Sequence, residues 1–244
     1  MADKNRIALV TGGNKGIGLE IARQLAEAGN LVIIGSRSSV RGQTAVEDLR
    51  SCGLEAETIV IDMNDHAGIA TAAQTIRLQH GHLDILINNA GMGDAEDGPP
   101  TSSSIEAVKR TMDTNFVGPL AVTQAMLPLL RKATAARIVN VSSHCGSLSV
   151  NGDPNWSPYY SMRFLGYNAS KAALNMMTVQ LAEELRDTSI VVNAVCPGCV
   201  KTDLNGHSGD LTPADGARLP VEYALLGDDA VSGRFVEAGA EVPW

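Results

Sequence analysis

Three of the four tyrosines in the chain fall within the stretch YYSMRFLGYNASK, residues 159–171. Two of them have a cation four residues later: Tyr159 is followed by Arg163, and Tyr167 is followed by Lys171. Residues four apart lie on one face of a helix, so either pair could place a positive charge beside a phenol. A phenol beside a cation can act as an acid, but the offset alone does not choose between the pairs.

Proton donation to a carbonyl oxygen is the chemistry that suits such a pair. The pKa of a free tyrosine, about 10, is a poor match for neutral pH. An ammonium about 4 Å away contributes roughly 4 kcal/mol at an effective dielectric constant near 20, or about three pK units before desolvation opposes it. If Tyr167 is the donor, Lys171 is expected to lower its pKa in this way; Arg163 could supply the same charge to Tyr159.

A glycine-rich loop, VTGGNKGIG at 10–18, follows an apolar run and precedes a helical pattern. Glycine permits a tight turn and a close approach of the backbone to a pyrophosphate, which the helix N-terminus then faces. An ordinary strand-to-helix turn is the alternative, but the strand before and the helix after favour a dinucleotide site. The predicted cofactor contacts here are Gly12, Asn14, Lys15, Gly16, Ile17 and Gly18.

The residues after the second apolar run indicate which dinucleotide fits. In an NAD site, an acidic residue about 20 positions after the glycines binds the ribose 2′-hydroxyl. Here the stretch GSRSSVR contains neither Asp nor Glu, and it offers Arg37 and Arg41, with Lys15 in the loop itself. Arginine suits a 2′-phosphate, so the sequence favours NADP(H). The alternative is that these cations are only solvated surface.

Apolar, β-branched runs alternate with helical patterns along the chain. The predicted strands are residues 6–11, 31–35, 56–62, 84–88, 137–143, 190–196 and 233–237. This alternation predicts an α/β fold, a doubly wound parallel sheet of about seven strands with helices on both faces. No linker or repeat divides the chain, so residues 1–244 are expected to form one domain.

Two helical segments have features of their own. Ser103 to Glu106 has the pattern of a capping box, and the helix that it starts carries an apolar stripe. The stripe consists of Ile105, Val108, Met112 and Phe116. The helix from about 167 to 187 is instead apolar nearly all the way round. Its outer face would be buried only by another subunit, so we expect a homo-oligomer in which this helix pairs about a two-fold axis.

Residue 119 is a proline inside a helical pattern. It has no N–H for the carbonyl of residue 115, so the helix should kink and leave the Asn115 carbonyl for another partner, such as an ordered water. A kink that serves packing alone is the alternative.

Four more motifs complete a pattern: NNAG at 88–91, NVSS at 140–143, YNASK at 167–171 and PGCVKT at 197–202. With the glycine-rich loop, in this order, they resemble the short-chain dehydrogenase/reductase family from residue 6 to about 204, and the loop looks most like its carbonyl-reductase branch. The resemblance implies a Rossmann-type fold and a reversible, NADPH-dependent reduction of a ketone or aldehyde to an alcohol. It also selects Tyr167, which alone has the motif and the apolar helix behind it.

The resemblance implies roles for individual residues. The catalytic tetrad corresponds to Asn115, Ser143, Tyr167 and Lys171, in which Ser143 polarises the carbonyl and Asn115 holds a proton-relay water. Besides Tyr167 and Lys171, the further cofactor contacts are Asp62, Met63, Asn89, Ala90, Gly91, Pro197, Gly198, Val200 and Thr202. Substrate contacts are expected from Ser143, Cys145, Trp156 and Tyr167, and no metal ligand set is expected.

The spacing between Ser143 and Tyr167 is wider than in shorter members of the family. The residues near 147–166 therefore resemble an insertion on the substrate side. Two interpretations of this segment remain open: a wall of the substrate site that favours bulky or apolar carbonyl compounds, and a surface loop with no effect on the substrate.

Composition excludes several other classes. The formal net charge of -8 argues against a nucleic-acid-binding protein, which needs clustered basic residues on its surface. No apolar run is long enough for a membrane span, and the first residues lack a secretory pattern, so we expect a cytoplasmic protein whose partner is a small molecule.

Two alternative functions use the same residues differently. Cys196 and Cys199 have the spacing of a thiol redox motif, although the residues between them belong to the implied cofactor loop. A zinc site that adds His207 to these thiols lacks a regularly spaced fourth ligand. A non-catalytic, NADP-sensing protein on the same fold is the other alternative.

Overall fold

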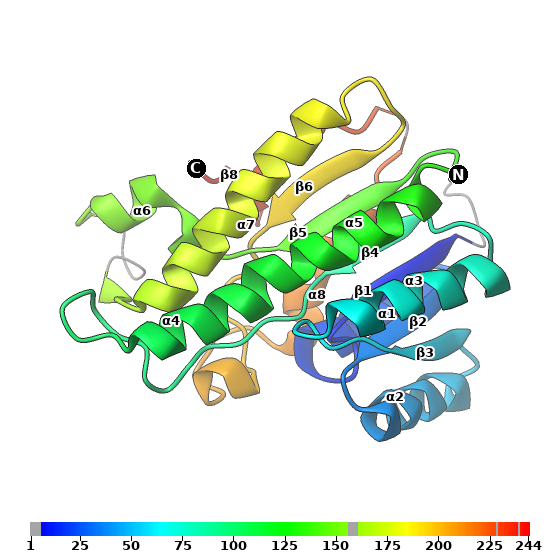
Figure 1. Ribbon diagram of the computed structural model, residues 1–244, viewed down its shortest axis with the longest axis horizontal. Coiled ribbons are helices and arrows are strands. Elements are labelled where there is room, and N and C mark those ends of the chain that lie inside the picture. The colour runs from blue at the N-terminus through cyan, green and yellow to red at the C-terminus, as the bar shows by residue number, and fades with distance from the viewer. Residues whose placement is uncertain (1–5, 156–160, 228, 239) are drawn as a thin grey trace.

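One sheet forms the centre of the computed structural model, which describes residues 6–155, 161–227, 229–238 and 240–244 (Figure 1). Across these residues the sheet has eight strands in the order β3-β2-β1-β4-β5-β6-β7-β8. They are β1 Ile7–Thr11, β2 Leu31–Ser36, β3 Ala56–Val60, β4 Ile85–Asn88, β5 Arg137–Val141, β6 Val191–Val195, β7 Phe235–Glu237 and β8 Ala240–Glu241. All seven predicted strands are present and parallel, and the eighth, β8, pairs antiparallel with β7.

Helices cover both faces of this sheet, with α3, α5 and α7 in front of it in Figure 1. The helices are α1 Gly16–Glu27, α2 Ser39–Ser51, α3 His66–Gln79, α4 Ile105–Met112, α5 Gly118–Leu130, α6 Leu148–Gly152, α7 Leu165–Glu184 and α8 Pro213–Ala224. Short turns are η1 Asp113–Val117, η2 His144–Gly146 and η4 Asp203–Asn205.

The sheet is buried on both faces by two hydrophobic cores. One contains residues of α3, α5 and α7, and the other contains residues of α1, α2 and α8. Successive residues of β1 point to opposite cores, Leu9 to the first and Val10 to the second. A central strand such as β1 therefore needs apolar residues at successive positions, which explains the continuous runs in the sequence. The predicted doubly wound α/β fold is confirmed.

Helix α4 differs from its prediction in two respects. Its N-cap is Ser104, whose hydroxyl accepts a hydrogen bond from the Ala107 N–H, and not Ser103. The apolar stripe is also not the most buried part of the helix: Ile105 is 69% exposed, and the buried residues of α4 are Ala107 and Thr111. Small side chains lie inward because α4 packs closely on α7.

The interruption predicted at Pro119 takes the form of a π-helical turn, η1, between α4 and α5. The Gly118 N–H bonds to the Asp113 carbonyl, five residues earlier. Pro119 then occupies the first turn of α5, where an N–H has no intrahelical acceptor. The wider turn carries Asn115, which is completely buried, and π-turns of this kind are frequent at functional sites.

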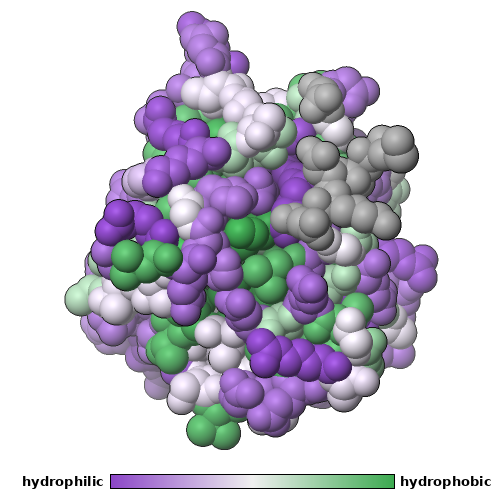
Figure 2. Space-filling model, turned by 90° about the vertical axis from the view of Figure 1, so that its right-hand side faces the viewer, coloured by the Kyte–Doolittle hydropathy of each residue, from purple (hydrophilic) through white to green (hydrophobic). Residues whose placement is uncertain are grey.

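The surface carries its hydrophobic residues in small groups among hydrophilic ones, as the face in Figure 2 shows. Exposed apolar residues such as Val40 and Leu78 are ordinary for a folded protein. On α7, Met176 and Val179 are exposed one helical turn apart, and the subunit contact through this helix stays a prediction. None of the described helices combines the length and hydropathy needed to cross a membrane.

Candidate active site

The glycine-rich loop between β1 and α1 has the backbone of a phosphate cradle. Gly12 and Gly16 have φ angles of +63° and +55°, which residues with a Cβ rarely adopt. A Cβ on Gly18 would lie 2.4 Å from Asn89 Nδ2, so only glycine lets α1 come this close to the end of β4. Helix α1 begins at Gly16, and its N-terminus favours an anion. Asn14, Lys15 and Ile17 complete the turn.

Thr11 joins the end of β1 to the segment after β4. Its Oγ1 accepts hydrogen bonds from the N–H groups of Asn89 and Ala90 at 3.0 and 3.1 Å. Its carbonyl accepts a third from Asn89 Nδ2 at 2.9 Å. A Cβ on the following Gly91 would lie 3.6 Å from Lys171 Nζ. This segment therefore connects the phosphate loop to the predicted catalytic lysine.

The predicted 2′-phosphate partners lie on the surface near this loop. Arg37 follows β2 directly and Arg41 lies in the first turn of α2, and both residues are exposed. Lys15 forms an ion pair with Asp203 of η4, and Asp203 also lies 3.1 Å from His207 Nε2. The ion pair gives Lys15 a partner that the sequence analysis did not predict.

The remaining predicted cofactor residues follow other strands at the same edge of the sheet. Asp62 and Met63 follow β3, and Pro197, Gly198, Val200 and Thr202 follow β6. A Cβ on Gly16 would lie 3.7 Å from Thr202 Cγ2, so the segment after β6 faces the phosphate loop. Ligands of open α/β sheets bind at this edge, and the positive-φ glycines and close approaches fit a dinucleotide there.

Ser143, Tyr167 and Lys171 come together between β5 and α7. Ser143 is close enough to Tyr167 to influence the pKa of its phenol, and Lys171 Nζ lies 5.7 Å from the centroid of the Tyr167 ring. The ammonium donates a hydrogen bond to the Val141 carbonyl at 2.9 Å. A Cβ on Gly146 would come within 2.6 Å of the Lys171 backbone, so this glycine lets η2 pack directly on α7.

Burial shifts the pKa values of both titratable groups. Although Tyr167 is only half-buried, desolvation of its side chain raises its pKa above the ordinary value of 10.0, while the nearby Ser143 hydroxyl opposes the change. Desolvation lowers the pKa of Lys171 to about 8. The prediction that Tyr167 has a lowered pKa is therefore wrong for this structure, because loss of hydration around the phenolate is the larger effect.

Asn115 connects three segments of the site. Its Oδ1 accepts a hydrogen bond from the Met92 N–H at 2.8 Å, and its Nδ2 donates to the Met92 carbonyl at 2.9 Å and to Ser170 Oγ at 3.0 Å. Ser170 Oγ in turn donates to the Tyr167 carbonyl at 2.7 Å. Asn115 thus holds the segment after Gly91 beside α7, and its part in a proton relay stays a prediction.

The predicted substrate contacts fall only partly within the described residues. Cys145 is 4% exposed, its Sγ lies 3.9 Å from Met162 Sδ, and burial raises the pKa of its thiol. Trp156 lies outside the described residues, as do Tyr159 and Tyr160. The alternative pair of Tyr159 with Arg163 is therefore not described.

A second cluster, made of His144, Cys196 and Glu237, lies where β5, β6 and β7 end. His144 Nε2 is 2.9 Å from Glu237 Oε2, and His144 Nδ1 is 3.6 Å from Cys196 Sγ, which donates to Glu237 Oε1 at 3.3 Å. These residue types can hold metal ions. However, the two ring nitrogens face different partners, so the imidazole bridges a thiol and a carboxylate within a hydrogen-bonded network.

The thiol redox alternative does not agree with the surroundings of Cys196. Its side chain is 3% exposed, and desolvation together with the charge of Glu237 raises the pKa of the thiol. A redox-active cysteine needs an accessible thiolate. The alternative zinc set does not agree with the structure either, because the potential ligands that surround Cys196 among the described residues are His144 and Glu237, not Cys199 and His207.

Three polar residues of this region were not identified from the sequence. They are Asp97, His144 and Glu237. The Asp97 carboxylate, for example, accepts a hydrogen bond from the Tyr167 N–H, 70 positions away. Contacts at such separations have no local spacing or periodicity that could reveal them.

Comparison with known proteins agrees with this geometry. The family model described as short chain dehydrogenase matches residues 6–211. The (-)-isopiperitenone reductase of Mentha piperita is 35% identical, with 96% of this chain and 97% of that protein covered. Carbonyl reductase (NADPH) 1 of Homo sapiens is 32% identical, with 100% of each covered. The structure of salutaridine reductase from Papaver somniferum has a TM-score of 0.81 at 32% identity, covering 95% of this chain and 99% of that one.

Proposed function

The chain belongs to the short-chain dehydrogenase family, and from that premise we propose that it reduces a ketone or aldehyde to an alcohol with NADPH. The observation that carries the proposal is that Ser143, Tyr167 and Lys171 meet between β5 and α7. Lys171 Nζ lies 5.7 Å from the centroid of the phenol ring, and Ser143 is close enough to influence the pKa of the phenol. A hydroxyl pair of this kind can bind one carbonyl oxygen, with one group polarising it and the other donating a proton.

In the proposed reaction, Ser143 donates a hydrogen bond to the substrate oxygen and Tyr167 gives it a proton. Bound NADPH would supply the hydride. Lys171, fixed by the Val141 carbonyl, keeps a positive charge beside the phenol and stabilises the phenolate that remains. Asn115 keeps the segment after Gly91 against α7, and in this proposal it also orders the water through which the proton is replaced.

The raised pKa of Tyr167 favours reduction over the reverse reaction. At neutral pH it keeps the phenol protonated, which is the form that a proton donor needs. The substrate oxygen becomes an alkoxide as hydride arrives, and an alkoxide is a much stronger base than a phenolate. Proton transfer from Tyr167 is therefore favourable even though the phenol is a weak acid. Alcohol oxidation needs the phenolate, so its rate should increase with pH.

The choice of NADPH over NADH rests on charge at the end of β2. Arg37 and Arg41 are exposed there, and no carboxylate stands in the segment 35–41. Lys15 adds a third cation in the phosphate loop. The same cofactor is part of the name of a relative by sequence, carbonyl reductase (NADPH) 1.

The segment near 147–166 is proposed as a wall of the substrate site within a single domain of residues 1–244. Its described part is tied to the helix that carries Tyr167: Asn168 Nδ2 donates to Asn151 Oδ1 and to the Met162 carbonyl, each at 2.9 Å. Met162 also contacts Cys145, two residues after Ser143. Apolar sulfur-bearing side chains beside the hydroxyl pair suit apolar carbonyl compounds.

The decisive experiment measures NADPH oxidation with a panel of ketones and aldehydes for the wild type and for Tyr167→Phe. The variant should lose turnover, because the substitution removes the proton donor. Its NADPH binding should stay nearly intact, because the substitution removes little contact area. Tyr159→Phe and Tyr223→Phe are the controls and should keep substantial activity. A Tyr159→Phe variant that is inactive beside an active Tyr167→Phe would contradict the assignment, and a wild type that binds NADPH but oxidises it with no carbonyl compound would favour a sensor.

A further inference from the structure

Asp97, in the loop between β4 and α4, places its carboxylate at the beginning of α7. Oδ1 accepts hydrogen bonds from the Gly98 N–H at 2.8 Å, from Ser103 Oγ at 2.9 Å and from the Gly166 N–H at 2.9 Å. Oδ2 accepts one from the Tyr167 N–H at 2.9 Å. One carboxylate therefore joins the loop to the second and third residues of α7.

Helix α7 depends on this carboxylate for its N-terminal cap. Its N-cap residue is Phe164, which has no side-chain oxygen to accept the first N–H groups of the helix. Those groups normally need such an acceptor, and a negative charge near them is also favourable. Asp97 supplies both from a different part of the chain.

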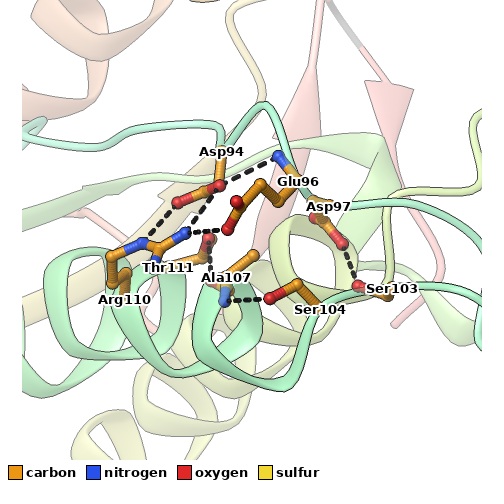
Figure 3. A network of polar contacts seen from close by, with 8 residues as sticks. All are labelled: Asp94, Glu96, Asp97, Ser103, Ser104, Ala107, Arg110 and Thr111. Carbon is orange, nitrogen blue, oxygen red and sulfur yellow. Dashed lines mark hydrogen bonds and ion pairs between the residues drawn. The ribbon is translucent and has the colours of Figure 1, made fainter.

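The loop that carries Asp97 is itself held in place (Figure 3). The Arg110 guanidinium on α4 donates to both carboxylate oxygens of Asp94, at 2.8 and 3.1 Å, and to Glu96 Oε2 at 2.8 Å. The Leu165 N–H donates to the Gly98 carbonyl at 2.9 Å, which adds a backbone link to α7. The loop thus forms a rigid connection between α4 and the first turn of α7.

The packing at this junction requires a glycine on α7. A Cβ on Gly166 would lie 3.0 Å from the Val108 Cα on α4 and 3.2 Å from Asp97 Oδ2. Even a methyl group would therefore have to displace either the neighbouring helix or the carboxylate. The sequence keeps the first turn of α7 free of bulk at the point where Asp97 binds it.

We propose that Asp97 is a positioning residue for Tyr167, an inference that rests on the proposed function. By fixing the N–H groups of Gly166 and Tyr167, Asp97 sets where the phenol lies relative to Ser143, which belongs to the segment after β5. Lys171, one turn later, is held independently by the Val141 carbonyl and by its close packing on Gly146. Loss of the cap should therefore loosen the turn that carries the proton donor and leave the lysine in place.

The consequence for catalysis follows from the geometry that proton transfer needs. A displacement of about 1 Å between reacting groups can cost on the order of a hundredfold in rate. Apart from Tyr167 and Lys171, the predicted cofactor contacts lie in the phosphate loop and in the segments after β3, β4 and β6, and none of the Asp97 hydrogen bonds described above reaches them. The effect should therefore appear in kcat and not in the affinity for NADPH.

The test compares Asp97→Ala and Asp97→Asn with Ser104→Ala, a control in the same loop that caps α4 and does not contact α7. Asp97→Ala should lower kcat by about tenfold to a hundredfold, with Kd for NADPH, measured by fluorescence, within about twofold. Asp97→Asn should lie between the wild type and Asp97→Ala, because it keeps one acceptor oxygen but places an N–H₂ group against a backbone N–H. Ser104→Ala should reduce Tm without reducing kcat.

Hydrogen exchange of the backbone amides provides a readout that does not depend on activity. In Asp97→Ala, and less so in Asp97→Asn, the amides of Gly166 and Tyr167 should exchange faster, with those near Lys171 unchanged. Two results would show that the positioning role is wrong. One is a loss of kcat in the Asp97 variants no greater than in Ser104→Ala, when the variants lose the same amount of Tm. The other is unchanged exchange of the amides at 166–167. A wild type without reductase activity would refute the proposed function instead, and the exchange measurement would still decide whether Asp97 orders this turn.

Discussion

Replacing Lys171 by methionine should change how the stability of the protein depends on pH. Lys171 is 5% exposed, and burial lowers the pKa of its ammonium from the ordinary 10.5 to about 8. Between those values the unfolded chain binds a proton that the folded chain does not, so the free energy of unfolding rises with pH in this window. Below pH 8 both states hold the proton, and the buried ammonium then costs about 3 kcal/mol of stability.

Methionine has a similar length and no charge, so Lys171→Met removes this cost. It also leaves the buried Val141 carbonyl without the donor that now lies 2.9 Å away, which costs about 1–3 kcal/mol. The two effects nearly cancel at pH 7. At pH 9.5 the wild type has recovered about 2 kcal/mol of the penalty, whereas the variant has no group to titrate. Relative to the wild type, the variant should therefore lose about 2 kcal/mol between pH 7 and pH 9.5.

Urea unfolding at pH 7, 8 and 9.5 measures this difference directly. The control is Lys132→Met, which removes an exposed lysine, and its stability should follow that of the wild type across the same range. A difference between the wild type and Lys171→Met that stays constant with pH would refute the reasoning, as would one that changes in the opposite direction. Either result would mean that the folded protein does not hold the Lys171 ammonium in a desolvated environment.

Four further outcomes are expected. Arg37→Asp should lower the ratio of kcat/KM for NADPH to that for NADH by about tenfold or more, because it replaces a partner of the 2′-phosphate by a repelling carboxylate; an unchanged ratio would contradict this. Asp203→Asn should lower Kd for NADPH by about threefold, since it frees Lys15 from an exposed ion pair, and a weaker affinity would oppose it. Light scattering should give the wild type a mass of at least twice 25.6 kDa and Met176→Glu a smaller one, whereas a monomeric wild type would rule out the contact. Pro119→Ala should slow turnover more than NADPH binding, and unchanged turnover from pH 6 to 9 would show that the π-turn serves packing alone.

The strands were predictable because burial on both faces removes the usual alternation of polar and apolar residues. Leu9 and Val10 point to different cores, and both must be apolar. Strand β8 was not predicted because a strand of two residues is too short to show a hydrophobic period. The buried face of α4 was not predicted for a different reason. Contact with α7 selects small residues such as Ala107, so the largest apolar side chains of α4 are not the buried ones.

The site was predictable to the extent that its residues follow strands or belong to motifs. The glycines of the phosphate loop, Ser143 and Lys171 all fall into this class. Asp97, whose role is proposed above, does not, because its partners lie on another element and become neighbours only when α4 packs on α7. The pKa of Tyr167 was predicted in the wrong direction because the sequence gives the distance to a cation but not the loss of hydration.

The opposite pKa shifts of Tyr167 and Lys171 have one cause and one chemical consequence. Burial disfavours the charged form of each group, so it raises the pKa of the phenol and lowers that of the ammonium. Among the described residues no carboxylate pairs with Lys171, whose ammonium donates to the neutral carbonyl of Val141. Its charge is therefore not neutralised before the reaction. In the proposed reaction Tyr167 gives up its proton, and the new phenolate and this ammonium then attract each other in surroundings of low dielectric constant, where such an attraction is strong. The environment that keeps the donor protonated at rest thus also stabilises the pair that proton transfer creates.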